Sequence, residues 1–124
     1  LSFGSGKAWL TGFERSTMGE MFQTAGLMVF PDMRPEQSFF TRSDNIGFAR
    51  RGIVAHTLST FDLHADYHQV SDDVSKADYV HMSAVINTAA RAVRLLADGP
   101  KPAWKPGGQP AQPTGGRGRG RGSN

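Results

Sequence analysis

Short, mostly apolar runs alternate with helical stretches along residues 7–98, and this alternation limits the fold more than any other feature. The runs are KAWLTGF at Lys7–Phe13, LMVF at Leu27–Phe30 and IVAHTL at Ile53–Leu58. Strands that are apolar throughout, rather than at every second residue, are typical of a mostly parallel sheet covered on both faces. The sequence therefore predicts an α/β fold.

Three helices are expected between and after these runs. Ser16–Ala25 contains Thr17 and Glu20 at the spacing of a capping box, and Ser43–Arg51 suits a second, shorter helix. Ala77–Ala97 has the strongest helical periodicity. Three short strands and three helices are few for a complete doubly wound domain, so we expect a part of a larger one. Apolar residues recur at three- and four-residue spacing in the last helix, at Met82, Val85, Ile86, Ala89, Ala90, Val93 and Leu96.

Charge and composition divide the chain into two predicted parts, residues 1–99 and residues 100–124. The first part carries nine Lys and Arg against eleven Asp and Glu, whereas the second carries five basic residues and no acid. The second part is rich in Pro, Gly and Gln and ends in GGRGRGRGSN. Such a composition buries too little apolar surface to offset chain entropy, so we expect residues 100–124 to be a disordered tail.

The same charge distribution indicates whether the chain binds nucleic acid. The mildly acidic residues 1–99 offer no basic face for nucleic acid, and three Arg-Gly units without interleaved aromatic residues are more typical of a solubilising terminus. We therefore expect no nucleic-acid partner. No apolar stretch approaches the roughly 20 residues of a membrane span. The chain has no Cys, which excludes disulfides and thiolate metal sites.

His and Asp are concentrated in the loop that follows the third apolar run. Residues 62–73 contain two His and four Asp. Ligands of open α/β sheets bind beyond the carboxyl ends of the strands, and imidazole and carboxylate are ordinary zinc ligands. Composition alone leaves a metal site and a plain surface loop both open. We expect His56 to be a buried, hydrogen-bonded core residue, and His81 to lie on a solvated edge of the last helix.

Two segments together resemble a known family. The first is FFTRSDN at Phe39–Asn45 followed by FARRGIVA at Phe48–Ala55, and the second is LHADYH at Leu63–His68 followed by Ser71 and Asp72. They are similar to the R-S-D-[HN]-x-x-F-x-x-x-G-I-P-A and D-Y-H-x-x-x-D signatures of the zinc aminopeptidase and glutamate carboxypeptidase family of di-zinc exopeptidases. The resemblance covers residues 7–98, and Val replaces the usual Pro at position 54.

The resemblance implies a three-layer α/β/α sandwich with a mixed, mostly parallel sheet, of which residues 1–99 are the C-terminal portion. It implies two zinc ions at the carboxyl ends of the strands and hydrolysis of a peptide or aminoacyl substrate by a metal-activated water. His68 matches the last zinc ligand of the family, and Tyr67 matches the residue that helps to hold the tetrahedral intermediate. Arg42 matches an Arg near the substrate in several members. Because many relatives are exported, the resemblance also implies a secreted or periplasmic protein.

The chain departs from the family in its remaining ligands. No Glu-Glu pair occurs in the sequence, and His68 alone cannot hold two zinc ions. We therefore expect this chain by itself to be inactive, with the other ligands lying upstream. Asp66 and Asp72 are both candidates for the partner of the second His68 nitrogen, and for both a plain loop cap is the open alternative. A non-catalytic receptor or scaffold relative and a glutaminyl-cyclase-like acyltransferase stay open as alternatives to an aminopeptidase.

Overall fold

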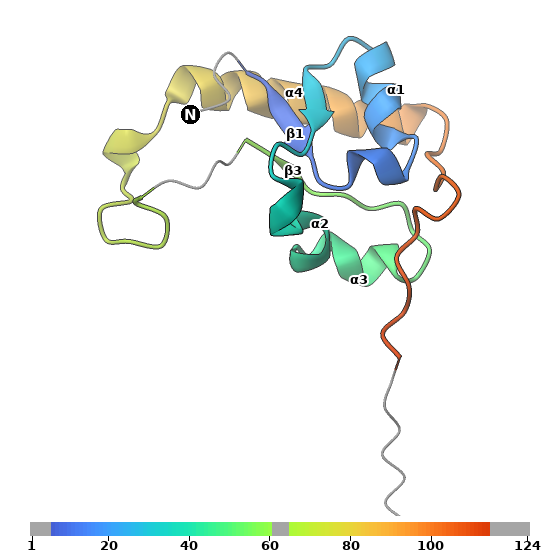
Figure 1. The fold of residues 1–124 in the computed structure, drawn as a ribbon. Coiled ribbons are helices and arrows are strands. Elements are labelled where there is room, and N and C mark those ends of the chain that lie inside the picture. The colour runs from blue at the N-terminus through green and yellow to red at the C-terminus, as the bar shows by residue number, and fades with distance from the viewer. Residues whose placement is uncertain (1–5, 61–64, 115–124) are drawn as a thin grey trace, which may run out of the picture.

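The computed structural model describes residues 6–60 and 65–114, and a small mixed sheet lies at its centre (Figure 1). Its strands are β1 (Ala8–Leu10), β2 (Val29–Pro31) and β3 (Leu58–Ser59). The order is β2-β1-β3, with β1 parallel to β2 and antiparallel to β3. The predicted α/β class is therefore confirmed.

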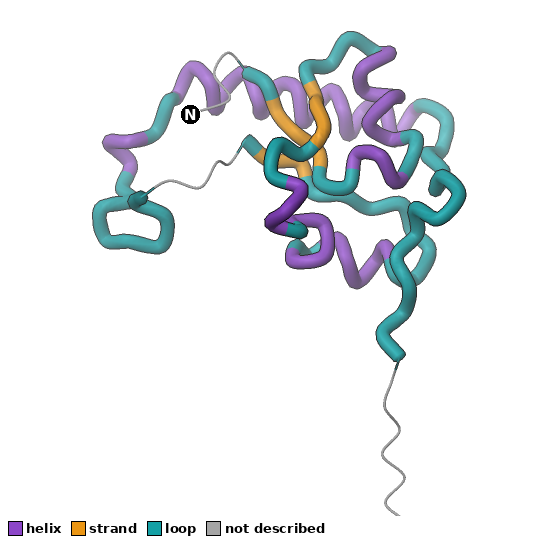
Figure 2. Tube along the Cα trace, viewed as in Figure 1, coloured by secondary structure: helices purple, strands orange, loops and turns teal. Residues whose placement is uncertain are grey.

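Helices and short 3-10 turns surround this sheet (Figure 2). The 3-10 turns are η1 (Phe13–Arg15), η2 (Pro35–Gln37) and η3 (Val74–Lys76). The α-helices are α1 (Met18–Thr24), α2 (Phe39–Arg42), α3 (Asn45–Ala49) and α4 (Tyr79–Asp98). Within the described ranges, no helix is long and apolar enough to cross a lipid bilayer.

The central strand β1 contributes to packing on both faces of the sheet. Leu10 joins a buried cluster with residues of α1 and α4, including Phe22 and Ala92. Trp9, the next residue along the strand, has its ring 5.6 Å from that of Phe39 in α2. Side chains of successive strand residues point to opposite faces, so β1 joins the α1 and α4 side of the core to the α2 side.

The third predicted strand is wrong in its extent, because β3 begins only at Leu58 and the preceding residues have no ladder partner. Side chains interrupt the ladder there. The Thr57 N–H donates to the Thr11 hydroxyl at 2.9 Å, and the Thr11 carbonyl faces the His56 ring instead of a backbone N–H. One backbone bond joins the two segments here, from the Thr11 N–H to the Thr57 carbonyl at 3.0 Å.

The predicted helices agree better with the structure. The helix expected at 77–97 is α4, and Asp78 caps it by accepting a hydrogen bond from the His81 N–H at 2.9 Å. The helix expected at 16–25 is α1, while α3 is shorter than the predicted Ser43–Arg51. The single turn of α2 was not predicted. A long segment with a clear apolar period is thus predicted more reliably from the sequence than a short turn.

The prediction of a disordered tail is wrong for its first part, because residues 101–112 form a segment that packs against the body, here named the C-terminal strap (Figure 1). The Thr17 N–H donates to the Ala103 carbonyl and the Lys105 N–H to the Arg15 carbonyl, both at 2.9 Å. The Trp104 Nε1 donates to the Gly52 carbonyl at 3.0 Å.

Average composition misled the prediction for a physical reason. The single aromatic residue of the strap, Trp104, packs at ring distances of 5.6 Å from His56 and 6.4 Å from Phe40. The prolines around it restrict the unfolded backbone, which lowers the entropy lost when the strap docks. The remainder of the predicted tail, residues 115–124, lies outside the described residues.

Candidate active site

Arg42 and Tyr67 line the same pocket, although they are far apart in the sequence. The pocket has a volume of about 200 Å³ and lies over Trp9 of the central strand. Hydroxyl side chains and the Phe39 ring complete its wall. A pocket with an aromatic floor, a phenol and a guanidinium suits a small polar substrate. Its other lining residues are Thr11, Ser43, Thr57 and Ser59.

Arg42 is the last residue of α2, and two contacts hold its side chain. The guanidinium carbon lies 5.8 Å from the centre of the Phe39 ring. The Nη1 atom donates a hydrogen bond to the Gln37 carbonyl at 3.0 Å. A guanidinium has five N–H donors, so this bond leaves Arg42 able to donate to a ligand in the pocket.

Tyr67 and His68 are adjacent and their rings stack. The ring centres are 3.9 Å apart and the planes are inclined at 41°. His68 has φ of 60°, in the left-handed region that residues with a side chain seldom adopt. Residues held in such conformations are concentrated at functional sites. The structure thus brings Tyr67 to the pocket of Arg42 and places the exposed His68 directly beside Tyr67.

A zinc centre needs more ligands than this part of the molecule offers. Across residues 6–60 and 65–114, no group of three or more His, Cys, Asp or Glu side chains is arranged to hold a metal ion. The predicted cluster includes Asp62 and His64, which lie outside the described residues. His68 is therefore a single candidate ligand rather than a metal site, and the described residues do not by themselves fit a di-zinc centre.

Asp66, one of the two candidate partners of His68, has a different set of contacts. Its Oδ1 accepts a hydrogen bond from the Ser71 hydroxyl at 2.7 Å and lies 2.6 Å from the Lys76 ammonium. These contacts join the Tyr67–His68 turn to η3, which immediately precedes α4.

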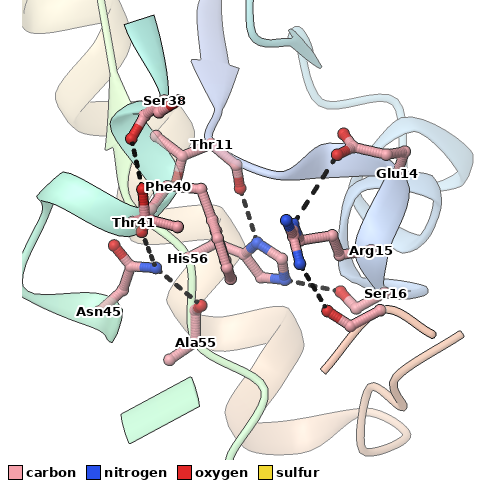
Figure 3. Close-up of polar contacts among 11 residues, drawn as sticks. Thr11, Glu14, Arg15, Ser16, Ser38, Phe40, Thr41, Asn45, Ala55 and His56 are labelled. Carbon is pink, nitrogen blue, oxygen red and sulfur yellow. Dashed lines mark hydrogen bonds and ion pairs between the residues drawn. The ribbon is translucent and has the colours of Figure 1, made fainter. Parts of the chain in front are cut away.

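A second group of polar residues surrounds His56, whose ring packs against Trp104 of the strap (Figure 3). The His56 Nδ1 is 2.7 Å from the Thr11 carbonyl, which can only accept, so Nδ1 carries the proton and donates. The neutral ring then accepts at Nε2 from the fully buried Ser16 hydroxyl, also at 2.7 Å. The expected hydrogen bonding of His56 is confirmed, although its side chain is half-buried rather than buried.

Burial lowers the pKa of His56 because it disfavours the charged ring. The nearby Arg15 lowers that pKa further, whereas the Thr11 carbonyl and Glu14 oppose the shift. Protonation would also put a hydrogen on Nε2 and abolish the bond that it accepts from Ser16. The network around His56 is therefore built for the neutral ring.

Stability is expected to fall as His56 becomes protonated. A pKa lowered by folding gives a contribution that is complete above the ordinary His value of about 6.5 and is lost as pH falls through the lowered value. Urea midpoints measured between about pH 7.5 and about pH 5 should show this decline. In His56→Gln the decline should be smaller than in the unchanged chain. Equal slopes for both proteins would contradict the assignment.

The prediction for His81 is wrong, since this residue is buried rather than on a solvated edge. Its Nδ1 accepts a hydrogen bond from the Gly6 N–H at 3.0 Å. Gly6 has φ of 76°, and a Cβ there would lie 2.6 Å from that of Ala84. The turn at Gly6 therefore lies directly against α4 and covers His81. The apolar period of the helix does not predict this contact, because it carries no information on which segment packs there.

Comparison with known proteins agrees with the motifs of the sequence. The chain matches the family described as Peptidase family M28 over residues 5–93. No curated protein and no solved structure matches the chain. The match spans both the segment with Arg42 and the segment with Tyr67 and His68, and it confirms the family expected from them. The chain therefore belongs to peptidase family M28.

Proposed function

We propose that this chain forms the closing part of the active site of a zinc aminopeptidase. Membership of family M28 supports a metallopeptidase that hydrolyses peptide bonds. The observation that carries the finer proposal is the shared pocket, in which Arg42 and Tyr67 meet beside the stacked His68 ring. A hydrolase of this kind needs a ligand for the metal and donors for the substrate close together.

The three residues take different roles in this proposal. His68 binds zinc through a neutral imidazole nitrogen. The Tyr67 hydroxyl donates to the oxygen on which negative charge develops during hydrolysis, and Arg42 holds the peptide or aminoacyl substrate in the pocket. Zinc, when bound, supplies a nucleophilic water at neutral pH.

The described residues contain no group of three or more side chains that could hold a metal ion, so the proposal takes the remaining ligands and the general base from elsewhere. We propose that they belong to a larger catalytic domain, a three-layer α/β/α sandwich of which residues 1–99 are the C-terminal portion. On this proposal the chain alone is inactive. Export to the periplasm or outside the cell stays a proposal drawn from the resemblance.

Tyr67→Phe tests the proposed function in the complete enzyme. We expect kcat/KM for an aminoacyl anilide to fall by about 10²–10³, which is the usual cost of one oxyanion donor. Bound zinc, measured by elemental analysis, should not change, because the phenol is not a ligand. Arg42→Met should raise KM with zinc retained.

Tyr79→Phe is the matched control, since Tyr79 is the only other tyrosine of the chain and its hydroxyl contacts the Val74 carbonyl at 3.4 Å on the surface. This variant should keep full activity. If the two variants are equally active, the Tyr67 hydroxyl takes no part in hydrolysis. A complete protein without bound zinc or hydrolysis would favour the non-catalytic relative instead.

A further inference from the structure

The Asn45 side chain fixes the direction of one hydroxyl in the pocket of Arg42. Its Nδ2 donates to the Phe40 carbonyl at 3.2 Å and to the Ala55 carbonyl at 3.3 Å (Figure 3). Carbonyl oxygens can only accept, so these two bonds determine which amide atom is nitrogen and which is oxygen. Asn45 Oδ1 then accepts, and the Thr57 hydroxyl donates to it at 2.9 Å. The hydrogen of this hydroxyl is therefore used within the protein.

The bond between Asn45 and Thr57 is costly to break. Asn45 is 7% exposed, so its Oδ1 would be left unpaired away from water if Thr57 turned its hydrogen towards the pocket. The backbone of Thr57 is held as well, because its N–H donates to the Thr11 hydroxyl at 2.9 Å. Thr57 lines the pocket. It therefore presents lone pairs there, as an acceptor.

Ser43 gives the same pocket a second acceptor. Its hydroxyl donates to the Phe39 carbonyl at 2.7 Å, within the turn of α2. A hydroxyl has one hydrogen, so Ser43 also lines the pocket with that hydrogen used and its lone pairs available. Arg42, the preceding residue, supplies donors alone. Among the described residues that line the pocket, Arg42 is the only charged one.

This combination discriminates between chemical groups of similar shape. A carboxylate accepts from Arg42 but meets the lone pairs of Thr57 and Ser43, and an ammonium group is repelled by Arg42. A ketone leaves both hydroxyl oxygens without a donor. A primary carboxamide has a carbonyl for the guanidinium and N–H donors for the two hydroxyl oxygens. Because Arg42 is exposed, its attraction for a carboxylate is too weak to reverse this order.

We infer that the pocket over Trp9 binds a primary carboxamide, with Thr57 as the specificity-determining acceptor and Asn45 as its positioning residue. The rings of Trp9 and Phe39, 5.6 Å apart, contact the apolar part of the ligand that carries the amide. The inference rests on the proposed function, in which this pocket holds the substrate. It names the substrate class as a peptide or aminoacyl compound with a carboxamide side chain.

Binding of benzamide to the 124-residue chain, followed by NMR shifts of Thr57 and Trp9, tests this site. Benzamide should bind about tenfold more tightly than acetophenone, which has the same shape without N–H donors, because it adds neutral hydrogen bonds. It should also bind more tightly than benzoate. Thr57→Val should remove the difference from acetophenone, whereas Thr57→Ser should keep it. In Asn45→Ala the hydroxyl is free to donate, so benzoate should gain on benzamide.

Thr41→Val is the matched control, since the Thr41 hydroxyl donates to the Ser38 carbonyl at 3.0 Å and lines a different pocket. It should leave the affinities for benzamide, acetophenone and benzoate unchanged. The Thr57 variants decide the outcome if Asn45→Ala does not fold. The measurement needs neither zinc nor hydrolysis, so its failure is distinct from failure of the proposed peptidase reaction.

Three results would overturn the inference. The first is equal binding of benzamide and acetophenone by the unchanged chain. The second is a preference for benzamide that persists in Thr57→Val. The third is binding of N-methylbenzamide as tight as that of benzamide, which would assign the pocket to a backbone amide.

Discussion

A chain that ends at Gly99 is expected to unfold at a much lower urea concentration than the full chain. It loses Trp104, whose ring packs against His56 and Phe40, and the backbone bonds that Ala103 and Lys105 make with the segment before α1. We expect a loss of about 3 kcal/mol in the free energy of unfolding, the low end for removing a packed Trp side chain, because Trp104 is half-buried. Urea denaturation followed by circular dichroism measures it.

Two further proteins make this result specific to the strap. A chain that ends at Thr114 keeps every described contact of the strap and should unfold like the full chain. Trp104→Ala in the full chain should reproduce most of the loss, because the Trp104 ring and its bond to Gly52 are removed together. If the chain ending at Gly99 unfolds at the same midpoint as the full chain, the strap does not stabilise the fold.

His68→Ala in the complete enzyme is expected to remove most of the zinc from one site and nearly all hydrolysis of an aminoacyl anilide. Each zinc ion has few protein ligands, so the loss of one imidazole weakens binding severely. A site without its metal also loses the water that the metal activates. Elemental analysis and steady-state kinetics on the same preparation measure the two losses together.

His64→Ala is the control for this variant, because it removes the same type of side chain four positions earlier in the sequence. It should keep both zinc and most of the activity, since the family resemblance places the ligand at the His that follows Tyr. Loss of zinc in His64→Ala but not in His68→Ala would transfer the ligand assignment to His64. Unchanged zinc in both would mean that the parent protein binds its metal through other residues.

Sequence patterns predicted those parts of the fold that depend on interactions between residues close together in the chain. Helix α4 follows from its apolar period, which lies along one face of the helix. Strands β1 and β2 follow from short apolar runs. Strand β3 does not, because the Thr11 and His56 side chains take part in the bonding where a ladder was expected.

For the candidate site, the sequence supplied the residues and the tertiary structure supplied their arrangement. Two short motifs identified Arg42, Tyr67 and His68 and the family. Their spacing contains no information that Arg42 and Tyr67 share a pocket, because this depends on how α2 and the turn pack around Trp9. The contact of Lys76 with Asp66 is likewise a product of the chain path into α4.

What the sequence by itself determined is thus the α/β class, the long helix α4 and membership of family M28, because these are recorded in apolar periodicity and contiguous motifs. Only the tertiary structure decided that the strap docks, that His81 is buried and that His56 stays neutral against Ser16. Each of these depends on contacts between residues 40 or more positions apart. Such contacts are fixed by shape and by hydrogen-bond pairing across the fold, which no local pattern encodes.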